Sequence, residues 1–143
     1  MRICVWKDSE YLNWCYVTRP DIKYRILAVE EGEVVYGFVV LRCIEDRYNI
    51  GHIVNLHFLP GREAYASLLI DGALDCLRES GADIAACHTF RQNPCYHLLA
   101  SNGFMNRGTL LYTWMVNKFA EDLPINVQDV RNWFLSVGDS DAV

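Results

Sequence analysis

Residues 92–104 of this chain read QNPCYHLLASNGF, and this stretch says more about the fold than any other part of the sequence. Pro94 favours the first turn of a helix, because its missing N–H lies where a helix has no internal partner for it. The two leucines give that helix an apolar face, and Gly103 suits the left-handed position that ends a helix. The stretch therefore predicts a short helix followed by a strand. The apolar run over 84–87 predicts a buried strand before it.

Length and composition limit the possible classes of protein. A chain of 143 residues with 52% hydrophobic and 22% charged residues is large enough to build one core, so we expect a single domain over residues 1–143. The net charge of -5 repels a phosphate backbone, and the sequence has no cluster of Lys and Arg, which argues against nucleic-acid binding. No apolar run approaches the ~18 residues that a membrane-spanning helix needs. We therefore expect a soluble protein.

The six cysteines favour a reducing compartment. They form no C-x-x-C pair, and most of them lie in apolar periodic segments. The first residues, MRICVWK, lack the apolar core of a signal peptide. Free thiols in the cytoplasm are therefore the favoured interpretation, with disulfides as the alternative. The four histidines and the cysteines show no metal-ligand spacing, so we expect no metal site.

The periodicity of apolar residues predicts alternating strands and helices along the chain. Asp8 or Ser9 caps a predicted short helix that ends near Arg19, because Pro20 disfavours helical angles before it. The remaining predicted elements are a strand over 24–30, a strand over 34–43, a strand over 52–59, a helix over 64–78, a strand over 84–88, the Pro94 helix, a strand over 109–116 and helical spacing over 127–134. The first two strands form a hairpin, and the strand–helix–strand unit after it places two parallel strands side by side.

This order of elements resembles that of the GCN5-related N-acetyltransferase superfamily. The strand IVNLHFLP over 53–60, the long helix after it and the LL…GF segment over 98–104 carry the resemblance. The stretches 11–24 and 133–141 are similar to bacterial members linked to polysaccharide biosynthesis. The resemblance implies an α/β fold with a mixed, mostly antiparallel sheet, two central parallel strands that splay apart, and flanking helices. Only 23 residues precede Tyr24, so the fold is expected to be shortened at its N-terminus.

The resemblance also implies a site for acetyl-CoA between the two splayed strands. Leu56, His57 and Phe58 are expected to supply a backbone N–H that polarises the thioester carbonyl, and to contact the pantetheine arm. The pyrophosphate is expected at the N-terminus of the following helix, on Arg62, Glu63, Ala64, Tyr65, Ala66 and Ser67. The family has glycines where this chain has Tyr65 and Ser67. Tyr65 either blocks the phosphates or contacts them through its hydroxyl, and the sequence leaves both open.

The catalytic candidates follow from the same resemblance. His57 is the candidate base that keeps an attacking amine neutral, because the ordinary pKa of histidine suits that task. The alternative is that His57 only satisfies a polar position beside the sheet. Many members place the acid that protonates the CoA thiolate four residues before Gly-Phe, which is Leu99 in this chain. Tyr96, one turn earlier, is therefore the candidate acid.

Two polar residues are candidate contacts for the acceptor substrate. Asn55 is predicted on the strand face of His57, together with Ile53, whereas His52 is predicted on the opposite face. His88 ends the next strand, where ligands gather in open α/β sheets, and its alternative role is to cap that strand. The acceptor implied by the resemblance is a small amine, for example an amino sugar.

Two classes of function stay open at this point. The first is an acetyl-CoA-dependent N-acyltransferase that acts on a small amine. The second is a binding or assembly module that keeps the fold without the cofactor, which Tyr65, Leu99 and the short N-terminus favour. A partner chain that supplies the missing elements would make the protein a homodimer. Asp139 and Asp141 lie in a polar tail, where we expect them in solvent.

Overall fold

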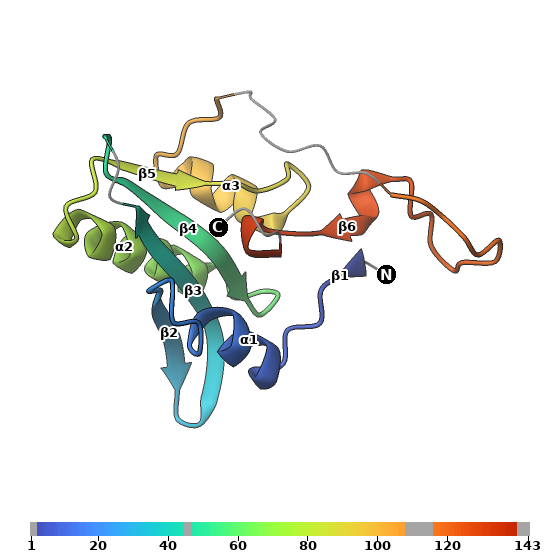
Figure 1. Cartoon of the computed structure of the whole chain (residues 1–143), viewed down its shortest axis with the longest axis horizontal. Helices are drawn as coiled ribbons and strands as arrows, with labels where there is room; N and C mark the ends of the chain where they lie inside the picture. Colours follow the sequence, from blue (N-terminus) through green and yellow to red (C-terminus); the bar gives the residue numbers. More distant parts are fainter. Residues whose placement is uncertain (1–2, 45–46, 108–115, 140–143) are drawn as a thin grey trace.

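The computed structural model describes residues 3–44, 47–107 and 116–139 (Figure 1). Strand β1 (Ile3–Cys4) and helix α1 (Ser9–Tyr16) come first. The Asp8 carboxylate caps α1 by accepting a hydrogen bond from the N–H of Tyr11 at 2.8 Å. This cap satisfies one of the N–H groups that a first turn leaves unbonded, as the sequence predicts.

A four-stranded sheet in the order β2-β3-β4-β5 forms the centre of the molecule. β2 (Arg25–Glu31) and β3 (Val34–Ile44) form the predicted antiparallel hairpin. β4 (Ile50–Phe58) runs antiparallel to β3, and β5 (Ile84–Cys87) runs parallel to β4. Parallel strands need a crossover, and helix α2 (Glu63–Glu79) supplies it, so the predicted strand–helix–strand unit is confirmed.

Helix α3 (Pro94–Ser101) has the ends that its sequence predicts. The Asn93 side chain accepts a hydrogen bond from the N–H of Cys95 at 2.9 Å, and Pro94 opens the first turn. Gly103 follows the helix with a φ of 87°, a conformation that glycine adopts without the penalty of a side chain. The strand predicted over 109–116 lies outside the described residues except for its last position.

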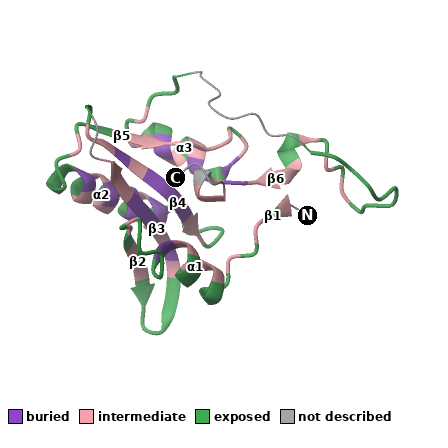
Figure 2. Ribbon diagram, in the orientation of Figure 1, coloured by how far each residue is buried: buried purple, intermediate pink, exposed green. Residues whose placement is uncertain are grey.

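The main core lies between the sheet and the helices α2 and α3 (Figures 1 and 2). It is built from buried side chains of β3, β4, α2 and α3, namely Val39, Leu41, Ile53, Leu56, Leu69, Ile70, Ala73, Leu77, Cys95 and Leu99. Helix α1 covers the opposite face of the sheet, where Tyr16 packs with Val40 and Val54. We refer to these two sides as the α2 face and the α1 face.

A β-bulge in β4 decides which side chains share a face. The neighbours Val40 and Leu41 of β3 pair with Asn55 and Ile53, so Val54 is an extra residue in β4. Val54 and Asn55 therefore both lie on the α1 face. The bulge shifts the alternation of side chains by one position for the rest of the strand.

The bulge corrects one expectation about the site. Strict alternation puts His57 on the face of Ile53, but Ile53 packs in the main core on the α2 face. The His57 ring instead stacks on Phe38, which packs on the α1 face, with ring centroids 5.3 Å apart. The predicted grouping of Asn55 with His57 holds, whereas their grouping with Ile53 is wrong.

The C-terminal segment differs from the helix that its apolar spacing predicts. It forms a 3-10 turn η1 (Val130–Asn132), strand β6 (Trp133–Phe134) and a second turn η2 (Val137–Asp139). β6 pairs in parallel with β1, so segments from the two ends of the chain form a small sheet (Figure 1). Pairing with a distant strand has overridden the local periodicity here. In the described part of the chain, no helix has the length and apolar character to cross a membrane.

Candidate functional site

The parallel strands β4 and β5 separate part of the way along β4. Their paired residues run from Ile50 with Ile84 to Ile53 with Cys87. β4 continues to Phe58, so among the described residues its pairing with β5 ends five residues before the strand does. We refer to the stretch Val54–Phe58 on the β5 side as the open edge of β4. β5 itself ends at Cys87, and the splay that the family resemblance implies is expected at this place.

Backbone groups of Leu56 and Phe58 point to the open edge. The N–H of Leu59 donates to the carbonyl of Tyr36 in β3 at 2.9 Å, and successive N–H groups in a strand alternate in direction. The N–H groups of Phe58 and Leu56 therefore face away from β3, and that of His57 faces β3. The Leu56 carbonyl agrees with this geometry, because it accepts a hydrogen bond from the Sγ of a cysteine in α3.

A buried polar cluster lies on the α1 face next to the open edge. At its centre is the ammonium group of Lys7, whose side chain is 9% exposed. Its Nζ lies 2.7 Å from Oδ1 of Asp139 and 3.0 Å from Nε2 of His57. It also lies 3.1 Å from Oδ1 of Asn55 and 3.4 Å from Oγ of Ser136. We name these five residues the Lys7 cluster; they come from the N-terminal segment, β4 and the C-terminal segment.

Further hydrogen bonds fix the cluster to the rest of the molecule. The N–H of Ser136 donates to Oδ2 of Asp139 at 2.7 Å, so this carboxylate has a partner on each oxygen. Asn55, which is 1% exposed, donates through Nδ2 to the hydroxyl of Tyr16 at 2.7 Å. The Tyr16 hydroxyl in turn donates to the carbonyl of Gly138 at 3.4 Å. Through these bonds, Asn55 of β4 and Tyr16 of α1 are connected to the C-terminal segment at Gly138.

The cluster keeps His57 neutral. Burial and the positive charge of Lys7 lower the pKa of His57 from 6.5 to about 4, and the negative charge of Asp139 opposes this shift only in part. An ammonium group can only donate, so Nε2 of His57 accepts and the ring proton resides on Nδ1. In this arrangement the lone pair that a base needs is bonded to Lys7.

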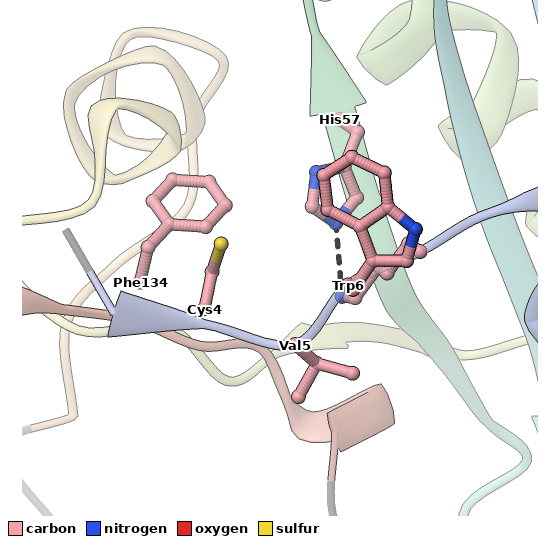
Figure 3. A pocket seen from close by; sticks show the side chains of 6 residues that line it. Cys4, Val5, Trp6, His57 and Phe134 are labelled. Atoms are coloured by element: carbon pink, nitrogen blue, oxygen red, sulfur yellow. Dashed lines mark hydrogen bonds between the residues drawn. The ribbon is translucent and has the colours of Figure 1, made fainter.

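A cavity of about 270 Å³ adjoins the cluster. Its walls come from the N-terminal segment, β4 and β6, through the residues Cys4, Val5, Trp6, Lys7, His57 and Phe134. Figure 3 shows the His57 ring, with its hydrogen bond to Lys7 drawn as a dashed line, and the side chains of Cys4 and Phe134 nearby. The lining is mostly apolar, with the imidazole and the ammonium as its polar groups.

The N-terminus of α2 lies against the β2–β3 hairpin. The Tyr65 ring stacks on Tyr36 of β3 with centroids 5.0 Å apart, and its hydroxyl donates to the Glu31 carboxylate. This hydrogen bond raises the pKa of Tyr65. The guanidinium of Arg62 lies 5.0 Å from the Tyr36 ring centre. Tyr65 is therefore held against the hairpin. The N–H groups of Tyr65 and Ala66 donate to the Arg62 carbonyl at 3.0 and 3.3 Å, so those of Glu63 and Ala64 are the first-turn N–H groups for which the helix has no carbonyl.

The residues predicted to contact a pyrophosphate differ in exposure. Arg62, Glu63 and Ala64 are exposed, as an anion site at a helix N-terminus requires. Tyr65 and Ser67, in the first turn and a half of α2, are half-buried. Ala66 is fully buried against the core, so only its backbone could meet a ligand.

The structure places Tyr96 and His88 in other surroundings. The Tyr96 hydroxyl accepts a hydrogen bond from Nδ2 of Asn106 at 3.2 Å. The His88 ring lies 6.2 Å from that of His52, and burial lowers the pKa of His88. Of the predicted site residues, the structure brings together Asn55, His57 and the backbone of the open edge.

The α3 side chain that reaches the open edge is Cys95. Its Sγ donates to the Leu56 carbonyl at 3.5 Å, and burial raises the pKa of the thiol to about 12, so it keeps its proton at neutral pH. Leu99, at the position where many family members have the acid, packs in the main core. All six cysteines are free thiols. Within the described ranges, no group of three or more His, Cys, Asp or Glu side chains could hold a metal ion.

Sequence reasoning missed three members of the Lys7 cluster. Asp139 was expected in solvent, and this expectation is wrong, because its side chain is 2% exposed and paired with Lys7. Lys7 follows the apolar run over residues 3–6, which was a signal that the lysine could be drawn into the interior. Ser136 carries no comparable local signal. The pairing of Lys7 with Asp139 joins opposite ends of the chain and has no local signature.

Comparisons with solved structures bear on the fold. No model of a known protein family matches the sequence, and no curated protein matches it. The chain is similar to an aminoglycoside acetyltransferase from an uncultured soil metagenomic sample, solved in complex with sisomicin, with a TM-score of 0.61 and 13% identity over 80% of this chain and 77% of that one. It is also similar to a protein described as "Putative acetyl transferase from Pyrococcus furiosus", with a TM-score of 0.57 and 16% identity over 66% of this chain and 68% of that one. The chain therefore has a mixed α/β fold, with a mixed sheet flanked by helices, like that of these acetyltransferase structures.

Proposed function

We propose that this protein is an N-acyltransferase that transfers an acyl group from acetyl-CoA to a small amine, for example that of an amino sugar. The observation that carries the proposal is the open edge of β4, where the N–H groups of Leu56 and Phe58 face the gap left by β5. Such an edge can bond the extended amides of a pantetheine arm as a neighbouring strand would. The same N–H groups can stabilise the oxyanion that forms on a thioester carbonyl.

The N-terminus of α2 is the proposed seat of the pyrophosphate. The N–H groups of Glu63 and Ala64 and the helix dipole favour an anion, and Arg62 adds a positive charge there. The carboxylate of Glu63 opposes binding. Tyr65 forms a wall of this site, because its ring is stacked on Tyr36 and its hydroxyl is bonded to Glu31.

The proposed reaction is direct attack of a neutral amine on the thioester carbon. The nitrogen forms a bond to the carbonyl carbon, the C–S bond breaks, and the departing thiolate takes up a proton. His57 is the proposed base and Asn55 a contact for the acceptor. The proton of the amine passes to Nε2 of His57, the nitrogen that is bonded to Lys7 in this structure. Tyr96 is the proposed acid; it accepts a bond from Asn106, so its own hydroxyl proton can still be donated.

A pair of substitutions at Phe58 tests the role of the open edge. Phe58→Pro removes the N–H together with the ring, whereas Phe58→Ala removes the ring alone. A net hydrogen bond is worth about 1 kcal/mol, so we expect Phe58→Pro to bind acetyl-CoA roughly five- to tenfold more weakly than Phe58→Ala in isothermal titration. Equal affinities of two folded variants would contradict the proposed geometry.

A binding module that keeps the fold without the cofactor is the second candidate. The observation that favours it is the bond between Lys7 and His57, which occupies the proposed base. In that case acetyl-CoA would not bind to the wild type. Acetyl-CoA titration therefore separates the two candidates.

A further inference from the structure

The Lys7 cluster carries an inference that rests on the proposed function and goes beyond it. We propose that the cluster is a subsite for the primary ammonium group of the acceptor, and that Lys7 fills it from within the chain. The N-terminal segment over residues 3–7 then holds the protein in an occluded form. The acceptor class is a primary alkylamine, whose carbon chain replaces that of Lys7.

The atoms around Nζ match a primary ammonium group. Such a group has three N–H donors and no acceptor. Four acceptor atoms lie within 3.4 Å of Nζ, and the nearest is a carboxylate oxygen of Asp139 at 2.7 Å. The Asp139 side chain is 2% exposed, so the cluster supplies a buried negative charge. A buried carboxylate needs a positive partner, but that partner need not come from the same chain.

The cluster lies close to the point where β4 and β5 stop pairing. Asn55 and His57 belong to β4 beyond its last pair with β5. Ser136 forms a bridge with Thr89, just after the end of β5. Nζ of Lys7 contacts Asn55, His57 and Ser136, so it lies on the α1 face beside the point where β4 and β5 stop pairing. In the proposed reaction the thioester enters this same gap. The bound ammonium group passes a proton to Nε2 of His57, and the neutral amine then attacks the thioester carbon.

The cavity beside Lys7 has room for the rest of an acceptor. Its volume is about 270 Å³, and its apolar walls include Val5 and Phe134. The segment that carries Lys7 is attached through β1, which has only two residues paired with β6. Strands this short contribute little on their own. Exchange of the Lys7 ammonium for that of an acceptor also keeps Asp139 paired, so the exchange avoids exposing an uncompensated buried charge.

The first test asks whether the cluster binds an added ammonium group. Lys7→Ala removes Cγ, Cδ, Cε and Nζ, and n-propylammonium has the same four heavy atoms. We expect millimolar n-propylammonium to raise the thermal unfolding temperature of Lys7→Ala, because binding to the folded state alone stabilises it. Lys7→Met fills the space without a charge and is the matched control. Neither Lys7→Met nor n-propanol with Lys7→Ala should show the effect, and Asp139→Asn in the Lys7→Ala chain should remove it.

The second test asks whether this subsite serves the acceptor. With acetyl-CoA and n-propylamine, we expect Lys7→Ala to form N-propylacetamide at least about tenfold faster than the wild type. When Lys7 occupies the subsite in most wild-type molecules, the apparent affinity for the amine falls in proportion to the fraction of molecules in which the subsite is open. The product is measured by mass spectrometry. Equal rates for the two proteins, or no thermal effect of n-propylammonium on Lys7→Ala, would overturn the inference.

A titration with acetyl-CoA comes before these tests. It shows whether a negative result contradicts the proposed function or only the present inference. If neither protein binds acetyl-CoA, the proposed function fails and the acceptor role fails with it. If Lys7→Ala binds both acetyl-CoA and n-propylammonium but forms no product, the acceptor role alone is refuted. Should Lys7→Ala not fold unaided, refolding with n-propylammonium replaces the thermal test. A yield no higher than with n-propanol would then overturn the inference.

Discussion

Lys7 carries a positive charge into a region where its side chain is 9% exposed. Removal of a charge from water costs several kcal/mol, and a nearby opposite charge offsets this cost only when the geometry is good. Asp139 provides that charge at 2.7 Å, and Ser136 and Asn55 satisfy further polar atoms. At the scale of single residues, the stability of the site therefore depends on keeping this pair complete.

Loss of one partner should destabilise the fold strongly. Lys7→Met leaves Asp139 buried without a counter-charge, so we expect the free energy of unfolding to fall by about 3–5 kcal/mol in urea denaturation. The matched control is Arg78→Met, which breaks an exposed pair with Asp75 and should cost less than about 1 kcal/mol. Equal losses in the two variants would contradict the burial of the Lys7 pair.

His57 should make stability depend on pH. Its pKa of about 4 in the folded chain is below the ordinary 6.5, so the unfolded chain takes up the proton first as the pH falls. The stabilisation is complete above pH 6.5 and is lost as the pH falls toward 4, by up to about 3 kcal/mol. Urea denaturation across this range should show a steeper loss for the wild type than for His57→Gln. Parallel curves would mean that the His57 pKa is not lowered.

At the scale of elements, β4 links the core to the site. Its side chains on the α2 face pack in the main core, while the bulge turns Asn55 and His57 toward the Lys7 cluster. β3 supports this strand closely at Gly37. A Cβ added there would meet the carbonyl oxygen of His57 at 2.7 Å, which is closer than real Cβ contacts allow.

Two glycine substitutions test this close approach. Gly37→Ala should lower the free energy of unfolding by about 1–3 kcal/mol, because the obstructing atom belongs to the backbone of β4. Gly72→Ala in α2 is the control, since its added methyl would meet only Leu27 at 3.6 Å. Alanine is the better helix former by up to about 1 kcal/mol, so Gly72→Ala should be neutral or stabilising in the same urea denaturation. A neutral Gly37→Ala would show that the two strands can move apart.

The elements that the sequence predicts well are those with local signals. The cap at Asp8, the proline at the start of α3 and the glycine after it each act within one turn, so one sequence is enough to place them. The bulge at Val54 is different, because it depends on the register with β3. β6 likewise depends on pairing with β1 at the other end of the chain.

The same distinction explains how much of the site could be predicted. Asn55 and His57 were identified because they are polar residues on a strand with a recognisable pattern. Lys7 and Asp139 meet only after the chain has folded, and no spacing connects them. The sequence favours free thiols, but the contact of Cys95 with the Leu56 carbonyl follows from the packing of α3 against β4.

At the scale of the whole molecule, both ends of the chain gather beside the open edge of β4. The N-terminal segment supplies Lys7, and the C-terminal segment supplies Ser136 and Asp139. Tyr65, which lies at the proposed pyrophosphate site, is held against the hairpin by Tyr36. The proposed acceptor side is thus occupied from within the chain, whereas the N–H groups of Leu56 and Phe58 face away from β3.

Tyr65→Gly tests whether this tyrosine closes the cofactor site. Because the Tyr65 ring is stacked on Tyr36, we expect the affinity for acetyl-CoA to change by less than about tenfold, or 1.4 kcal/mol. Isothermal titration of the wild type and the variant measures this directly. Binding that appears only in Tyr65→Gly would show that the tyrosine blocks the phosphates.

The central claim is that the gap beside β4 binds an acyl-CoA. The most direct test is isothermal titration of acetyl-CoA into the folded wild type, with ADP as a ligand that has the pyrophosphate but no pantetheine arm. We predict binding in the micromolar range for acetyl-CoA and at least about tenfold weaker binding for ADP, because the arm supplies the contacts with the open edge. Absence of binding by acetyl-CoA, or equal affinity for both ligands, would contradict the claim.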